Sequence, residues 1–154
     1  MIRFHQEGKY MKLVVFNVGS ALCVYAEHQT TRIVFDIGKG NNFSPVNDFL
    51  LPLYEKRGEH RLKNRNNRYG ISQLIVSHPH KDHISDIQEF DKNFYAHLLT
   101  TPNSKSPNGN PQNINWRKIT TPDDPDVKYL KRMKIGRNLP LRSFDSEHLK
   151  IGYL

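Results

Sequence analysis

The sequence predicts an α/β or α+β protein, and three observations support that fold class. Short β-type runs separated by turn residues fill the first third of the chain. An apolar face with helical spacing follows, and a second strand pattern then leads into another helix. Alternating strands and helices are typical of helices packed against a sheet. The 154 residues are the length of one domain, so we expect a single unit over 1–154.

Three strands are predicted close together near the start. They cover Leu13 to Val18, Ala21 to Ala26 and Thr31 to Phe35. Gly19 and Ser20 suit a turn after the first strand, and the run from Asp36 to Gly40 ends the third. Because the connections are short, we expect an antiparallel meander.

A helix is predicted next, from the capping and spacing of its residues. Ser44 is a good N-cap, and Pro45 suits the first helical position. Pro52 should kink or divide the helix, because proline has no backbone N–H. The apolar face of this helix comprises Val46, Phe49, Leu50 and Leu53.

The rest of the chain predicts further strands and helices around a long loop. Ile71 to Ser77 reads as a buried strand, and a helix begins near Ile84. Phe94 to Thr100 is another strand candidate. Residues 101–125 are rich in Pro, Asn and Ser and predict a long loop, and Asp126 to Lys134 predicts a last helix.

The chain is basic, with 23 Lys and Arg against 15 Asp and Glu and a formal net charge of +8. This excess favours anionic partners such as nucleic acid or phosphoester substrates. The basic stretches Lys56 to Arg68 and Arg117 to Arg137 could guide an anionic polymer. A solvated basic surface is the alternative, and runs without interleaved aromatic residues favour it.

The lengths of the apolar runs and the number of cysteines indicate the cellular compartment. The longest apolar runs are far shorter than the roughly 18 residues of a membrane span, and the N-terminal residues lack a secretory pattern. Cys23 is the single cysteine, so it can form neither an intramolecular disulfide nor a Cys-based zinc site. We therefore expect a cytoplasmic protein without a membrane segment, in which Cys23 is an inert buried thiol.

The segment Ser77 to His83 carries the strongest chemical signal. It follows a strand pattern directly and holds His78, His80, Asp82 and His83. Imidazole and carboxylate groups are good Zn²⁺ ligands. His78 and His80 are two residues apart and can share one metal, whereas Asp82 and His83 could face a second. A chance cluster of surface histidines is the weaker alternative, because the segment includes a carboxylate and follows a buried strand.

This segment resembles the His-x-His-x-Asp-His signature of the metallo-β-lactamase superfamily, and within it the competence-type, ComEC-like hydrolases. The resemblance covers about residues 12–90 and includes the Asp36-x-Gly38 motif. It implies an αββα sandwich, of which this chain resembles the first half followed by a tail.

The resemblance also implies roles for single residues. His78 and His80 would bind a first metal, Asp82 and His83 a second, and Asp82 would have a catalytic role. The cofactor would be one or two Zn²⁺ ions, with other divalent metals as alternatives. Asp36 would support the ligand loop by hydrogen bonding, and a metal-bound imidazole needs such an acceptor for its other N–H.

Some ligands of the superfamily have no counterpart that the sequence identifies. A third histidine and a bridging aspartate are expected downstream, but the contexts of His97 and His148 match no ligand motif. The expected function is a metal-dependent hydrolase that uses a zinc-activated water on a phosphodiester, nucleic acid or another ester-like bond. The alternative is a truncated or non-catalytic half-domain that binds nucleic acid or a second chain completing the fold.

Overall fold

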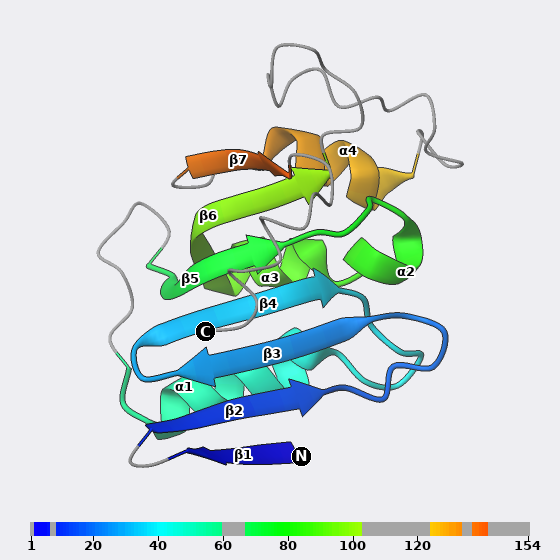
Figure 1. Cartoon of the computed structure of the whole chain (residues 1–154). Helices are drawn as coiled ribbons and strands as arrows, with labels where there is room; N and C mark the ends of the chain where they lie inside the picture. The colour runs from blue at the N-terminus through cyan, green and yellow to red at the C-terminus, as the bar shows by residue number, and fades with distance from the viewer. Residues whose placement is uncertain (1, 7–8, 60–66, 103–123, 134–136, 142–154) are drawn as a thin grey trace.

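A seven-stranded mixed sheet forms the centre of the computed structural model, with its strands in sequence order (Figure 1). The structure describes residues 2–6, 9–59, 67–102, 124–133 and 137–141. The strands are β1 (Ile2–Gln6), β2 (Lys9–Val15), β3 (Cys23–His28), β4 (Thr31–Ile37), β5 (Tyr69–Ile75), β6 (Phe94–Pro102) and β7 (Arg137–Leu141). The helices are η1 (Pro45–Leu50), α1 (Leu51–Lys56), α2 (Lys81–Ile84), α3 (Ile87–Asn93) and α4 (Pro125–Arg132).

The sheet is antiparallel in its first half and parallel in its second. β1 to β4 pair antiparallel, and this confirms the predicted meander for β2, β3 and β4. β4, β5, β6 and β7 then pair parallel. As a result, β2, β4, β5 and β6 end at the same edge of the sheet, where β3 begins (Figure 1).

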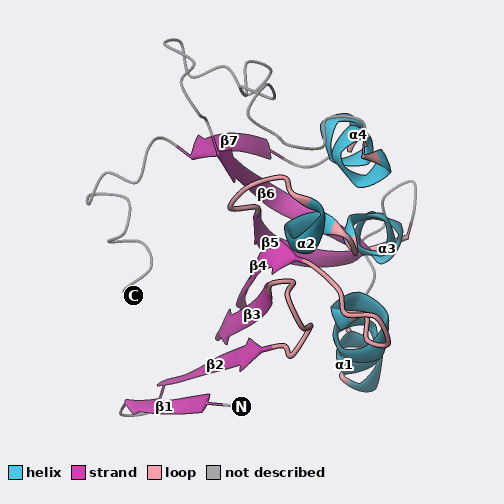
Figure 2. Cartoon of the chain, turned by 90° about the vertical axis from the view of Figure 1, so that its right-hand side faces the viewer, coloured by secondary structure: helices cyan, strands magenta, loops and turns pink. Residues whose placement is uncertain are grey.

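The helices α1, α3 and α4 cover one face of this sheet (Figure 2). Large side chains between the two layers, among them Tyr25, Tyr54, Phe90 and Phe94, are fully buried. Cys23 is buried in the same core, as expected of an inert thiol. Burial raises the pKa of the Cys23 thiol, so the nucleophilic thiolate is disfavoured. The α/β class is thus confirmed.

The first helical segment runs without a break from Pro45 to Lys56 and changes its hydrogen-bond type next to Pro52. Ser44 caps it, because the Ser44 Oγ accepts a hydrogen bond from the backbone N–H of Asn47 at 3.0 Å. The first turns, Pro45–Leu50, have π-helical geometry, and the α-helix begins at Leu51 with Pro52 in its first turn. Since Pro52 has no N–H to donate to the preceding turn, the hydrogen-bond pattern changes at this point.

Several sequence expectations concern the ends of elements. The strand expected from Leu13 to Val18 starts earlier, at Lys9, and ends at Val15. Phe16 and Val18 are buried but belong to the loop after β2. The last predicted helix is present as α4, with Val127 and Leu130 buried. β1 and β7 were not expected from the sequence.

The predicted basic stretches are described only in part. Residues 60–66, most of the long loop and His148 lie outside the described residues. Arg57 hydrogen-bonds the Glu27 carboxylate, and Arg68 is buried and paired with Asp91. These two guanidinium groups therefore hold the fold together instead of facing a ligand.

In the described part of the chain, no helix is long and apolar enough to cross a membrane.

Candidate metal centre

The histidine segment leaves the end of β5 and turns into the short helix α2. The backbone N–H of His80 donates to the carbonyl of His78, and that of His83 donates to the carbonyl of His80. These two tight turns fold the segment back on itself. Side chains that alternate along an extended strand are thereby gathered on one side of the loop.

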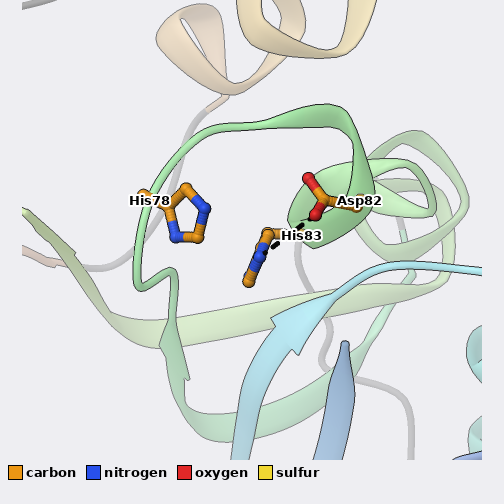
Figure 3. Close-up of side chains that lie close together, drawn as sticks. All are labelled: His78, Asp82 and His83. Atoms are coloured by element: carbon orange, nitrogen blue, oxygen red, sulfur yellow. Dashed lines mark ion pairs between the residues drawn. The ribbon is translucent and has the colours of Figure 1, made fainter. Parts of the chain in front are cut away.

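Three potential ligand groups converge in this loop: His78, Asp82 and His83 (Figure 3). One nitrogen of each histidine and one carboxylate oxygen of Asp82 all lie within 4.8 Å of one another. The Nε2 atom of His83 is 3.4 Å from the Oδ2 atom of Asp82. Two ligands of one tetrahedral zinc ion, each bound at about 2.05 Å, are separated by about 3.3 Å. Both the donor types and this spacing therefore fit a shared divalent cation.

Asp36 fixes the orientation of His83. Its Oδ2 atom accepts a hydrogen bond from the Nδ1 of His83 at 2.7 Å, and its side chain is 2% exposed. With the proton on Nδ1, the lone pair of the neutral ring is on Nε2, the atom that faces Asp82. Asp36 has a positive φ of 51°, a conformation that aspartate and asparagine tolerate better than most residues.

Ser77 links Asp36 to both His78 and His83, a role that no sequence motif indicates. Its backbone N–H and its hydroxyl both donate to the Asp36 carboxylate, at 2.7 and 2.6 Å. The Ser77 Oγ also lies 3.1 Å from the Nδ1 of His78. Because the hydroxyl proton goes to Asp36, the oxygen can accept the Nδ1 proton of His78. This arrangement leaves the Nε2 atom of His78 available as a ligand.

The surroundings of His78 favour its neutral form. Burial lowers the pKa of His78, and the nearby His83 and His80 lower it further. Asp36 and Asp82 act in the opposite direction, but burial is the largest influence. A metal ligand must be deprotonated, so this shift favours metal binding at neutral pH.

His80 is not one of the three converging groups, but its ring contacts that of His78 edge-on. Its ring centroid is 4.6 Å from that of His78, against 3.7 Å between His78 and His83. The predicted pairing of His78 with His80 is therefore less close than the contact of His78 with His83. His97, which is not assigned as a ligand, lies on β6 as an exposed residue against Tyr95.

The helix that carries Asp82 is held by the loops around it. The backbone carbonyl of Asp82 accepts a hydrogen bond from the N–H of Leu22 at 3.0 Å. A Cβ atom at Gly38 would lie 1.9 Å from the same carbonyl oxygen, so only glycine fits there. Asp86, just after α2, is buried and accepts hydrogen bonds from the Ser44 hydroxyl and the Val46 N–H. These contacts set the position of α2 relative to β4.

Comparisons with known proteins give one structural likeness. The chain matches no protein-family model and no curated protein. It is similar to a crystal structure from Thermotoga maritima described as a "putative metallo-beta-lactamase", at 23% identity and a TM-score of 0.33. The match covers 60% of this chain and 42% of that one. The functional assignment therefore depends on the side chains described above.

Proposed function

We propose that the chain is a metal-dependent hydrolase of the metallo-β-lactamase type. The observation that carries this proposal is the convergence of His78, Asp82 and His83, with the Nε2 of His83 3.4 Å from the Asp82 carboxylate. The Asp36-x-Gly38 and His-x-His-x-Asp-His motifs, and their resemblance to that superfamily, support it. Zn²⁺ suits two imidazoles and a carboxylate, and other divalent ions are alternatives.

Each residue of the centre has a proposed role. His78, Asp82 and His83 would hold the ion, and His80 would complete the set or bind a second ion. When bound, a zinc ion supplies a water molecule whose pKa is lowered to about 7. Asp36 keeps the proton on the Nδ1 of His83 and so directs Nε2 towards the ion. The Asp82 side chain is 46% exposed, and we assign it to accept the proton of the attacking water.

A phosphodiester is the substrate class that we favour. The net charge of +8 attracts polyanions, and the ComEC-like character of the motifs points the same way. Nucleic acid is therefore the proposed partner, and other ester-like bonds remain within reach of the same chemistry.

Hydrolysis of bis(p-nitrophenyl) phosphate by zinc- or manganese-loaded protein tests this function. We expect turnover in the native chain and its loss in His78→Ala, Asp82→Asn and His83→Ala, with His80→Ala also strongly impaired. His97→Ala is the matched control, since His97 is an exposed histidine on β6. Equal activity in His83→Ala and His97→Ala would refute the assignment.

A second candidate function is a non-catalytic module that binds a partner chain. The specific observation in its favour is the sheet face opposite the helices, which has no helix on it within the described residues (Figure 2). Val15 alternates with the buried Val14 and is 60% exposed. Metal analysis separates the two functions, because a well-folded sample with neither bound zinc nor phosphodiesterase activity supports the binding module.

A further inference from the structure

A pocket of about 310 Å³ lies between the loop after β2 and the loop after β4. None of the residues assigned to the metal centre lines it. Its polar lining comes from residues that the proposed hydrolysis leaves unused, and Phe43 adds an aromatic ring. The lining includes Asn17, Ser20, Lys39, Asn41, Asn42 and Phe43.

The chemistry of this lining suits an anion. Lys39 contributes a positive charge, and the other polar side chains are amides and a hydroxyl, with no carboxylate among the lining residues. The Nζ of Lys39 forms an ion pair with the buried Oδ1 of Asp86 at 3.9 Å, a distance too long for a hydrogen bond, so its N–H donors are not used there. Since the Lys39 side chain is 45% exposed, its ammonium donors can reach a bound group.

The same contacts that position α2 connect this pocket to the helix of the metal centre. Leu22, next to the first loop, donates its N–H to the carbonyl of Asp82. In the second loop, Gly38 packs against that carbonyl, and the Lys39 N–H donates to the Ser85 hydroxyl at 2.9 Å. Both walls of the pocket are therefore attached to the helix that carries Asp82 and His83.

We propose that this pocket binds a phosphate group of the substrate adjacent to the phosphate that is cleaved, with Lys39 as its charged contact. The inference rests on the proposed function, because it assigns the pocket to a polymeric phosphodiester. A volume of about 310 Å³ is at the small end of ligand pockets and suits a phosphate with part of its sugar. Charge-assisted hydrogen bonds from lysine and amide donors are the usual means of phosphate recognition.

Titration of metal-free protein with inorganic phosphate, followed by ¹H–¹⁵N NMR, tests the pocket independently of catalysis. We expect the amide signals of Gly19, Lys39 and Gly40 to move. Lys39→Gln should weaken the binding roughly tenfold, as for loss of one charged hydrogen bond. Lys92→Gln is the matched control, since Lys92 is an exposed lysine on α3. Unchanged phosphate affinity in Lys39→Gln, or shifts confined to other loops, would overturn the proposal.

Asn17→Asp is a second variant, chosen in case Lys39→Gln disturbs Asp86. Asn17 is exposed, so its replacement leaves the core intact and adds a negative charge to the pocket. It should weaken phosphate binding with little change in melting temperature. Phosphate affinity equal to that of the native chain would contradict the proposal.

Two thymidine oligonucleotides extend the test to the metal-loaded enzyme. Lys39→Gln should raise the KM for the trinucleotide TpTpT severalfold and leave that for TpT, which has one phosphate, nearly unchanged. Equal effects on both substrates would overturn the adjacent-phosphate assignment. If the native enzyme does not turn over but metal-free protein still binds phosphate in this pocket, the hydrolase proposal fails and the anion site stands.

Discussion

Asp36 and His83 are 47 residues apart in the sequence, yet 2.7 Å separates the Asp36 carboxylate from the His83 Nδ1. The sequence motif names both residues, but only the parallel pairing of β4 with β5 brings them together. Ser77 and Asp86 could not be assigned from the sequence. Their roles depend on hydrogen bonds to Asp36, Ser44 and Val46, all about forty residues away along the chain.

Removing the charge of Asp36 tests its support of His83. Asp36→Asn keeps a residue that tolerates the positive φ of this position, so the backbone should be preserved. Loss of the carboxylate should lower zinc affinity by about 10- to 100-fold, the usual effect of removing such a partner. Competition with a chromophoric zinc chelator measures this affinity. Asp126→Asn, which removes a carboxylate bound to Gln88, is the control, and equal affinity in both variants would rule out the orienting role.

The buried Asp86 predicts a specific pH dependence of stability. Burial raises its pKa from the ordinary value of 3.8, despite hydrogen bonds from Ser44 and Val46 and the nearby Lys39, which lower it. The folded state therefore binds a proton more tightly than the unfolded state. As a result, this residue's contribution to the free energy of unfolding rises as pH falls through its folded-state pKa.

Comparison with Asp86→Asn isolates this contribution. Urea unfolding at pH 7 and near pH 4 gives the free-energy difference between the two proteins at each pH. Asparagine removes the buried charge. Asp86→Asn should therefore raise the free energy of unfolding more, or lower it less, at pH 7 than near pH 4. A difference that does not change with pH would show that Asp86 has no raised pKa.

At the scale of elements, hydrophobic spacing and capping residues predicted the strands and helices whose local sequence preference agrees with their packing in the fold. Ser44 sets the start of the first helical segment, as expected, and the change from π- to α-helical hydrogen bonding falls next to Pro52. β1 has only two apolar residues, Ile2 and Phe4, in a five-residue segment, and β7 contains Pro140. Pairing with neighbouring strands defines both, and a single segment does not show its pairing partner.

Because the β4–η1 loop contacts α2 closely, we expect alanine substitution to affect stability differently at the two glycines of this loop. Gly38→Ala would place a methyl group against the Asp82 backbone carbonyl, so the loop or α2 must shift. We expect a loss of about 1–3 kcal/mol in unfolding free energy, as for overpacking, together with weaker zinc binding. The nearest neighbour of a Cβ at Gly40 is 3.4 Å away, which makes Gly40→Ala the control. Similar unfolding curves for the two variants would contradict the tight contact.

At the scale of the whole molecule, the sheet topology explains why the candidate site lies where it does. The strands β2, β4, β5 and β6 end at one edge, where Asp36 lies near the end of β4. The loops that leave this edge carry the histidine segment and the polar pocket. The resemblance to an αββα half predicted a sheet with helices on one face, and α1, α3 and α4 occupy one face (Figure 2). The strands pair in sequence order, but spacing along the sequence does not show that β5, β6 and β7 each pair parallel with the preceding strand.

A metal centre that ties β5 to α2 and, through Asp36, to β4 should stabilise the whole chain. Zinc at about 100 times its dissociation constant adds about 2.7 kcal/mol, or roughly 5–10 °C in melting temperature for a chain of this size. Calorimetry with zinc and with a chelator measures the shift. His83→Ala should show little response and His97→Ala the full response, whereas identical shifts in both would place the zinc elsewhere.

Zinc content after equilibrium dialysis and desalting tests the central claim most directly. The native chain should retain at least one zinc ion per molecule, and the combined variant His78→Ala, Asp82→Ala, His83→Ala should retain almost none while its circular dichroism spectrum stays native. A native chain that retains no zinc or other divalent ion, or a triple variant that retains as much as the native chain, would contradict the account.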